Sequence, residues 1–239
     1  MISDIHGNLA ALEAVLAAAD AAGVDELWCL GDLVGYGARP NECCSTVRRR
    51  ATTCLAGNHD LAVRGTLALT DFSGDARVAA EWTQTVLDDE ARAYLDSLET
   101  TAVRPGVELY HGSPRDPVWE YVLSDEAALV SLLLTEAQVV LVGHSHVALQ
   151  LSVDESLQLE GGPAPAGTEL RLDGRRWLLN PGSVGQPRDG DRRAAWLELD
   201  VEAQAARFHR VDYDIARTQA EIRAAKLPHV LADRLSHGL

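Results

Sequence analysis

Five of the eight histidines follow short apolar stretches of the chain and stand beside aspartate, asparagine or glycine. Imidazole nitrogens together with carboxylate and amide oxygens, and without a thiolate, suit borderline divalent ions such as Mn²⁺, Fe²⁺, Co²⁺ or Zn²⁺. These residue types therefore indicate a metal site that could carry chemistry, rather than a structural zinc site or an all-oxygen calcium site. The five histidines are His6, His59, His111, His144 and His146.

The candidate ligands lie in five short motifs, and each motif follows a stretch that we expect to be a strand. Ligands bind at the carboxyl ends of strands in α/β sheets, so all five motifs can converge on one site. Asp4 and His6, like His144 and His146, are spaced i and i+2, and an extended backbone would direct both side chains of each pair to one face. In chain order the motifs are Asp4-Ile5-His6, Gly31-Asp32, Gly57-Asn58-His59-Asp60, Tyr110-His111-Gly112 and Gly143-His144-Ser145-His146.

Between the motifs, the apolar residues alternate between the spacing of helices and that of short strands. We expect helices over 9–22 and 40–50, and a further helix whose N-cap is Ser124. This alternation predicts an α/β fold built from βαβ units, with helices packed on the faces of the sheets. The expected strands near the motifs cover residues 26–30, 52–56, 107–110 and 139–142.

Two parts of the chain depart from this alternation. We interpret residues 61–100 as a helical insertion over one edge of the sheet. Residues 147–211 contain short alternating strands between Gly- and Pro-rich turns, which is typical of an antiparallel or mixed sheet. No repeat or long linker marks a second domain, so we expect a single domain over 1–239. The further helices that we expect lie at 75–87, 89–98, 213–226 and 230–235.

The start of the chain is short for a buried strand. Only three residues precede Asp4, whereas strands commonly run about five or six residues. We therefore expect a truncated first strand or a misassigned start. A frayed strand would hold Asp4 and His6 loosely and reduce occupancy of the metal position that they supply.

Composition and charge exclude several classes of protein. The chain has 239 residues with 21 Lys and Arg against 36 Asp and Glu, a net charge of −15, which disfavours capture of a nucleic-acid duplex through its backbone. No apolar stretch is long enough to span a membrane and no signal peptide is recognisable, so we expect a cytoplasmic protein. The four cysteines lack the spacing of a zinc site, and we expect inert thiols.

The five motifs, taken in this order, resemble the calcineurin-like metallophosphoesterase superfamily. Three further strings resemble its small bacterial phosphodiesterase-like members, so that the resemblance covers nearly the whole chain. It implies a four-layer αββα sandwich with mixed sheets and a centre of two divalent metal ions, with Mn²⁺ favoured and Fe²⁺, Ni²⁺, Co²⁺ or Zn²⁺ as alternatives. The three strings are Gly31-Asp-Leu-Val-Gly-Tyr-Gly37, Gly112-Ser-Pro114 and Asn180-Pro-Gly-Ser-Val-Gly-Gln-Pro-Arg188.

The resemblance also implies a role for each motif residue. His59 would not bind metal but would donate a hydrogen bond to a phosphoryl oxygen or a proton to the leaving group, with Asp60 orienting it. This role needs a protonated ring, which nearby carboxylates favour. A hydroxide that bridges the two ions would attack phosphorus in line with the leaving group. One ion would be held by Asp4, His6, Asp32 and His146, and the second by Asp32, Asn58, His111 and His144.

Three other residues are weaker candidates for contact with the substrate. Arg115, like the nearby Glu120, could touch substrate or could take part in surface ion pairing. Arg188 could bind phosphate, or its Gly- and Pro-containing segment could simply pack near the site. Tyr36 could stack on a nucleobase or could be a packing residue.

We therefore predict metal-dependent hydrolysis of phosphodiester bonds, with phosphomonoesters as an alternative, in a small phosphorylated substrate. A non-catalytic scaffold, such as the retromer subunit that resembles this superfamily, is a second hypothesis, but no ligand is missing here. A protein phosphatase or dinucleoside-polyphosphate hydrolase is a third, although their GDxxDRG pattern is replaced by GDLVGYG at 31–37. An exposed sheet edge could support a homo-oligomer.

Overall fold

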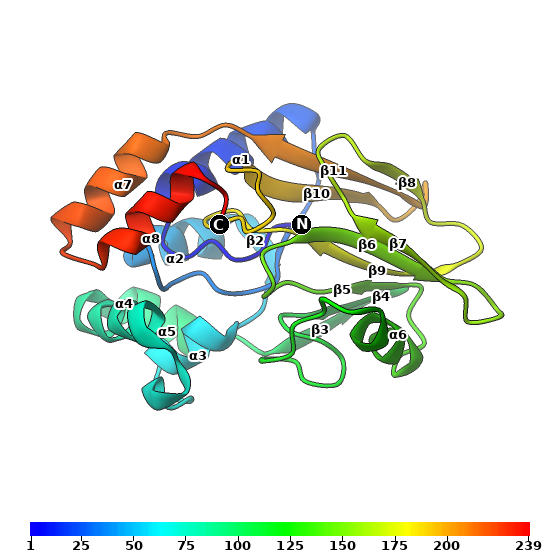
Figure 1. Ribbon diagram of the computed structural model, residues 1–239, viewed down its shortest axis with the longest axis horizontal. Helices are drawn as coiled ribbons and strands as arrows, with labels where there is room; N and C mark the ends of the chain where they lie inside the picture. The colour runs from blue at the N-terminus through cyan, green and yellow to red at the C-terminus, as the bar shows by residue number, and fades with distance from the viewer.

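Two β-layers lie face to face in the computed structural model, which describes residues 1–239 (Figure 1). One layer is a six-stranded sheet in the order β3-β4-β5-β9-β6-β7. In this sheet β4, β5 and β9 pair in parallel, whereas β3, β6 and β7 pair antiparallel with their neighbours, so the sheet is mixed. Its strands are β3 (Thr101–Arg104), β4 (Val107–Tyr110), β5 (Val139–Leu141), β6 (Ala148–Val153), β7 (Leu159–Pro163) and β9 (Arg176–Pro181).

The other layer consists of two smaller sheets that the N-terminal segment joins. β1 and β2 pair in parallel, and β11 pairs antiparallel with both β10 and β8. Ile2 forms a parallel bridge with Cys29 of β1, while the Leu197 N–H of β10 donates to the Met1 carbonyl at 3.0 Å. The strands of this layer are β1 (Leu27–Cys29), β2 (Ala51–Cys54), β8 (Glu169–Arg171), β10 (Ala194–Asp200) and β11 (Ala205–Val211).

Apolar clusters hold the layers together. Leu109, Leu141 and Leu179 of the mixed sheet pack against Leu197 and Phe208 of the facing layer. On the outer face of that layer, the apolar sides of α1 (Leu9–Ala22) and α2 (Pro40–Arg50) are buried together with Cys29 of β1. The helix α6 (Asp125–Leu133) packs on the outer face of the mixed sheet. The order of layers is therefore helix, sheet, sheet, helix, which confirms the predicted α/β sandwich.

The helix ends follow the signals that the sequence carries. The Asn8 side chain accepts a hydrogen bond from the Ala11 N–H at 3.2 Å and caps α1, which ends at Gly23 in a left-handed conformation (φ 76°). Ser124 caps α6 in the same way, by accepting from the Ala127 N–H. Pro40 occupies the first turn of α2, where its missing N–H costs nothing. The predicted bounds of these helices are confirmed.

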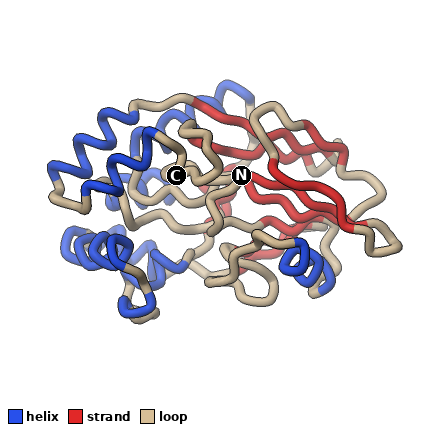
Figure 2. Tube along the Cα trace, in the orientation of Figure 1, coloured by secondary structure: helices blue, strands red, loops and turns tan.

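Most of the other helices gather on one side of the strands (Figure 2). Three elements were not predicted: α3, which begins at the Asn58 motif and spans only six residues, η1, which spans only three, and β3, which has partly exposed and exposed residues only. All three are too short to show a clear periodicity. None of the helices combines the length and the apolarity needed to cross a membrane. The additional helices are α3 (Asn58–Val63), η1 (Leu69–Asp71), α4 (Gly74–Val86), α5 (Asp89–Asp96), α7 (Ile215–Ala224), α8 (His229–Asp233) and η2 (Arg234–Ser236).

The segment before the first motif is firmly bonded despite its shortness. The Ile2 N–H donates to the Trp28 carbonyl at 2.9 Å, and the Asp4 N–H donates to the Gly31 carbonyl at 3.0 Å. From the other side, the Val184 N–H donates to the Ser3 carbonyl at 2.9 Å. Ile2 is also fully buried. The expectation that Asp4 and His6 are held loosely is therefore wrong, because backbone bonds from two neighbouring segments replace a longer strand.

The cysteines are all free thiols. Cys29, Cys43 and Cys44 are buried and Cys54 is partly buried. Burial raises the pKa of the Cys43 and Cys44 thiols well above their ordinary value, since the thiolate would lose its hydration. The prediction that these thiols are inert is consistent with this environment.

Candidate metal centre

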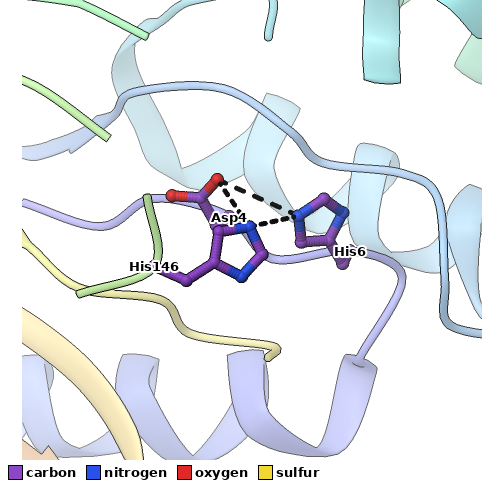
Figure 3. Close-up of side chains that lie close together, drawn as sticks. All are labelled: Asp4, His6 and His146. Atoms are coloured by element: carbon purple, nitrogen blue, oxygen red, sulfur yellow. Dashed lines mark hydrogen bonds and ion pairs between the residues drawn. The ribbon is translucent and has the colours of Figure 1, made fainter. Parts of the chain in front are cut away.

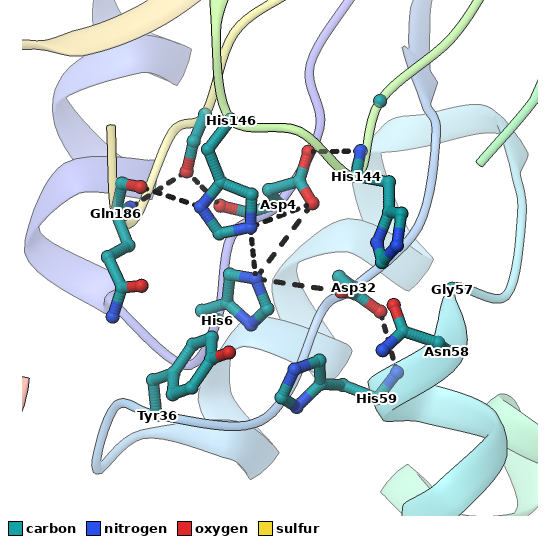
Figure 4. A network of polar contacts seen from close by, with 12 residues as sticks. Asp4, His6, Asp32, Tyr36, Gly57, Asn58, His59, His144, His146 and Gln186 are labelled. Carbon is teal, nitrogen blue, oxygen red and sulfur yellow. Dashed lines mark hydrogen bonds and ion pairs between the residues drawn. The ribbon is translucent and has the colours of Figure 1, made fainter. Parts of the chain in front are cut away.

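The predicted ligands converge on one buried site, as Figure 4 shows for most of them. Asp32 follows β1, Asn58 follows β2, and His111 follows β4. The remaining ligands come from the N-terminal segment and from the loop after β5. Each of the seven side chains is at most 3% exposed. The prediction that strand ends distant in sequence meet at one place is confirmed.

The first group of ligands consists of Asp4, His6 and His146 (Figure 3). The Nε2 atoms of His6 and His146 lie 3.1 Å apart. The Oδ1 atom of Asp4 lies 3.3 Å from His146 Nε2 and 3.9 Å from His6 Nε2. Three ligand atoms from two distant parts of the chain therefore surround one position that could hold a metal ion.

The second group lies directly beside the first and is built around His111. Its Nε2 atom lies 3.4 Å from Asp32 Oδ2, 3.1 Å from Asn58 Oδ1 and 3.2 Å from His144 Nδ1. The same Asp32 Oδ2 atom lies 3.6 Å from His6 Nε2 in the first group. Asp32 is therefore placed between the two groups, as a bridging ligand must be.

Hydrogen bonds to backbone carbonyls determine which nitrogen of three rings faces the site. Nδ1 of His6 pairs with the Val34 carbonyl at 3.0 Å, and Nδ1 of His111 pairs with the Leu30 carbonyl at 2.9 Å. The His146 Nδ1 pairs with the carbonyl of Gln186 at 2.6 Å. Only a protonated nitrogen can donate to a carbonyl, so in each neutral ring the Nε2 lone pair points into the site.

Unpaired acceptors in the site fit a cation. Asp4 Oδ1 and Asp32 Oδ2 are buried and have no hydrogen-bond donor. The other oxygens of these carboxylates accept from the backbone N–H groups of His144 and His59, at 3.2 and 2.9 Å. Buried oxygens that face imidazole lone pairs are strongly unfavourable unless a positive charge lies between them. The donor set, nitrogen and oxygen without sulfur, suits divalent ions of the borderline class.

Known proteins resemble this chain in sequence and in fold. A family model described as the calcineurin-like phosphoesterase superfamily domain matches residues 1–203. The chain belongs to this superfamily. It is 37% identical to an uncharacterized protein of Methanocaldococcus jannaschii over 244 aligned residues, covering 100% of this chain and 97% of that protein.

Two solved structures show the same fold over the whole length of this superfamily member. The crystal structure of a metallophosphoesterase from Sphaerobacter thermophilus is 43% identical, with a TM-score of 0.90 and coverage of 100% of this chain and 97% of that one. A hypothetical protein from Pyrococcus horikoshii has a TM-score of 0.80 at 20% identity, with the same coverage of both chains. The second likeness concerns the fold alone.

The charges of the site act strongly on one another. Burial by itself would raise the pKa of Asp4 and Asp32, but His146 beside Asp4 and His111 beside Asp32 hold both pKa values below their ordinary range. Burial would lower the pKa of His111, yet the Asp32 carboxylate raises it to about 9. A proton on His111 therefore balances part of the negative charge of the buried carboxylates.

The backbone of this phosphoesterase site is left-handed at most of the predicted ligands. The φ values are 55° for Asp4, 50° for His6, 54° for Asp32, 61° for His144 and 59° for His146. The expectation that the i and i+2 pairs lie on extended backbone is therefore wrong. Each pair reaches the site through tight left-handed turns, a conformation that persists only where the surroundings enforce it and that concentrates at functional sites.

His59 stands at the edge of the centre and is oriented by packing. Its ring lies between those of Tyr36 and Phe72, with centroid distances of 4.6 and 4.9 Å, and its Nδ1 has no hydrogen-bond partner. A Cβ on Gly35 would collide with this ring. Burial lowers the pKa of His59 to about 4, so the expectation of a protonated ring is wrong for the metal-free protein.

Asp60 does not orient His59. Its carboxylate accepts the backbone N–H groups of Leu33 and Val34 at 2.9 and 3.2 Å, and that of Gly57 at 3.0 Å. Both oxygens are thus used to bind the loop after Asp32 to the start of α3. Asp60 therefore positions the two backbone segments that carry Asp32 and Asn58, which differs from the predicted role.

Of the weaker candidates, two lie at the site and one does not. Tyr36 packs on the His6 ring with a centroid distance of 4.5 Å, and its hydroxyl lies 3.3 Å from Arg188 Nη2. Arg115 forms an ion pair with Glu120, and its side chain is 49% exposed. The alternative interpretation of Arg115 as a surface ion-pair residue therefore agrees with the structure better than contact with substrate.

Sequence reasoning missed three aromatic residues beside the centre. Tyr121 stacks on His144 with a centroid distance of 3.9 Å and an interplanar angle of 21°. Trp119 meets the same ring edge-on at 6.4 Å, and it also contacts Phe72 at 5.2 Å. No motif surrounds these residues, and their proximity to His144 depends on loop conformations that spacing does not encode.

Proposed function

We propose that this phosphoesterase depends on two divalent metal ions and hydrolyses phosphodiesters, with phosphomonoesters as weaker substrates. The observation that carries the proposal is that two ligand groups with unpaired acceptors lie side by side. Asp32 Oδ2 lies close to ligands of both groups, so it could bind an ion in either position. We propose Mn²⁺ as the favoured ion. Nitrogen and oxygen ligands also accept Fe²⁺, Ni²⁺, Co²⁺ or Zn²⁺, which are the alternatives. Asp4, His6, Asp32 and His146 would hold one ion, and Asp32, Asn58, His111 and His144 the other.

When bound, the two ions would supply a deprotonated water nucleophile and neutralise charge on the phosphoryl oxygens. The chain positions the substrate around them. The His59 ring lies next to the ligand groups, with one ring nitrogen close to the ligand atoms of His6 and Asp32, so it can engage a phosphoryl oxygen or the leaving group. The ring is neutral before binding, because burial lowers its pKa to about 4. A negatively charged phosphoryl group beside it would raise that pKa and favour the protonated ring, which could then donate a hydrogen bond to a phosphoryl oxygen or a proton to the leaving group.

The preference for a diester rests on charge. A diester carries one negative charge at neutral pH, whereas a monoester carries up to two, and the chain has a net charge of −15. The guanidinium carbon of Arg188 lies 5.8 Å from the centroid of the Tyr36 ring, and Arg188 already bonds Gln186 Oε1 at 2.9 Å. A site with little free positive charge beyond its metal ions is better matched to the singly charged ester.

The test uses metal-stripped protein to which Mn²⁺, Ni²⁺, Co²⁺, Zn²⁺ or Mg²⁺ is restored in turn. Hydrolysis of bis(p-nitrophenyl) phosphate is compared with that of p-nitrophenyl phosphate. The proposal predicts metal-dependent turnover with a higher kcat/KM for the diester. A higher kcat/KM for the monoester would contradict the diester preference, and no turnover with any ion would favour the non-catalytic scaffold.

A further inference from the structure

Four aromatic side chains border the metal centre, and we call them the aromatic rim: Tyr36, Phe72, Trp119 and Tyr121. They come from three separate parts of the chain. Tyr36 lies between β1 and α2, Phe72 follows η1, and the other two lie between β4 and α6. Each touches a histidine of the site or another member of the rim, with centroid distances from 3.9 to 5.2 Å.

Most side chains of the aromatic rim are partly exposed to solvent. Tyr121 is 47% exposed although one face of its ring is stacked on His144. Tyr36 and Trp119 are partly exposed, and only Phe72 is buried. Packing alone would favour burial of these large apolar surfaces. The exposed faces therefore remain accessible to a ligand that enters the centre.

We propose that the aromatic rim binds a planar ring in the alcohol part of the phosphate ester, as in a nucleotide. The inference rests on the proposed function, because it takes the phosphoryl group to lie at the metal centre. An ester group attached to that phosphorus extends past the side chains around the centre. Tyr121 and Trp119 lie against His144, a ligand of the second group, so their faces lie within reach of the ester group.

The aromatic character of the rim determines which class of ester group it favours. Aromatic faces gain most from a flat ring, through stacking or edge-to-face contact, and this gain depends little on the identity of the ring. Arg188, whose guanidinium carbon lies 5.8 Å from the centroid of the Tyr36 ring, adds a cation beside one member of the rim. A flexible alkyl group has no planar face, and a small alkyl group does not reach the rim. Phosphate esters of planar aromatic alcohols or nucleosides are thus the preferred substrates.

The test measures binding, with non-hydrolysable probes and Mn²⁺-loaded protein. Calorimetric titration compares methylphosphonate, cyclohexylphosphonate and phenylphosphonate, which share the phosphonate and differ in the attached group. The wild-type protein is expected to bind phenylphosphonate about 10-fold more tightly than methylphosphonate, and more tightly than cyclohexylphosphonate. Tyr121→Leu and Trp119→Leu should reduce the phenyl-to-methyl ratio to about 3 or less, whereas Tyr121→Phe should retain it.

Trp28→Leu is the matched control, because Trp28 lies near Arg104, away from the centre, and its substitution should leave the ratio unchanged. Tyr121 is half exposed, so its leucine variant keeps the test informative if Trp119→Leu fails to fold. Equal affinities for phenyl- and methylphosphonate, tighter binding of the cyclohexyl probe, or a ratio that survives Tyr121→Leu would overturn the inference and leave the proposed function intact. If none of the three phosphonates binds while Mn²⁺-dependent turnover of bis(p-nitrophenyl) phosphate persists, the inference fails and the proposed function stands; if that turnover is absent as well, both fail.

Discussion

Metal binding at the second ligand group is expected to depend steeply on pH because of His111. Its Nδ1 already donates to the Leu30 carbonyl, so a metal ion and a second proton compete for Nε2. Although burial opposes it, the neighbouring Asp32 carboxylate raises the pKa of His111 to about 9 in the metal-free protein. A group with such a pKa is about 99% protonated at pH 7 and about 90% at pH 8. The apparent affinity for the second ion should therefore rise about 10-fold between pH 7 and pH 8.

The first ligand group provides an internal comparison. Burial lowers the pKa of both His6 and His146, so neither ring carries an extra proton at neutral pH. Binding of an ion there should release no proton from these two rings, and the affinity for that ion should change little between pH 7 and pH 8. The two groups are thus expected to differ in pH dependence although they share Asp32.

The assay is calorimetric titration of metal-stripped protein with Mn²⁺ at several pH values, in buffers of different ionisation enthalpy. At pH 7 we expect about one proton released from His111 for two ions bound, in addition to any proton from the water that the ions ionise. His111→Gln should lower the release by about one proton, whereas His146→Gln should retain the His111 contribution. Absence of proton release, or an affinity for both ions that does not change from pH 7 to pH 8, would refute the reasoning.

Three substitutions test the other residues of the site. His59→Ala should lower kcat by about 10²- to 10⁴-fold while the metal content, measured by mass spectrometry, stays at the wild-type value; lost metal would instead make His59 a ligand. Asp60→Asn should lower the free energy of unfolding by about 1–3 kcal/mol in denaturant titration, because it removes an acceptor from buried backbone N–H groups. An unchanged midpoint of unfolding would contradict the positioning role of Asp60. Arg115→Ala removes a surface ion pair with Glu120 and should leave kcat/KM for the diester within about twofold, and a large rise in KM would restore Arg115 as a substrate contact.

Local signals were sufficient to predict much of the fold. Asn8 and Gly23 mark the ends of α1 because each satisfies backbone groups within its own turn, which is a property of the residue itself. The convergence of the metal ligands was equally predictable, since topology brings the carboxyl ends of strands together wherever they lie in the sequence. The elements that were missed, α3, η1 and β3, are too short to show a periodicity.

Properties that depend on three-dimensional surroundings could not be predicted. The protonation of His59 follows from burial beneath Tyr36 and Phe72, and neither residue is close to it in sequence. Asp60 stands next to His59 in the chain, but its carboxylate turns to the backbone of the loop after Asp32. Tyr121 reaches His144 only because a loop without regular structure places it there. Sequence patterns identified the ligands, whereas packing determines their charge and their neighbours.

The central claim is that Asp32 joins two metal positions, and the metal content of matched variants tests it most directly. Wild-type protein and Asp32→Asn are reconstituted with Mn²⁺, freed of unbound metal and measured by mass spectrometry. We expect two ions per chain in the wild type. In the variant both positions should be weakened, with fewer than one ion retained, because the shared carboxylate faces His6 and His111 at once. A single ion in the wild type, or two ions retained in Asp32→Asn, would contradict the account.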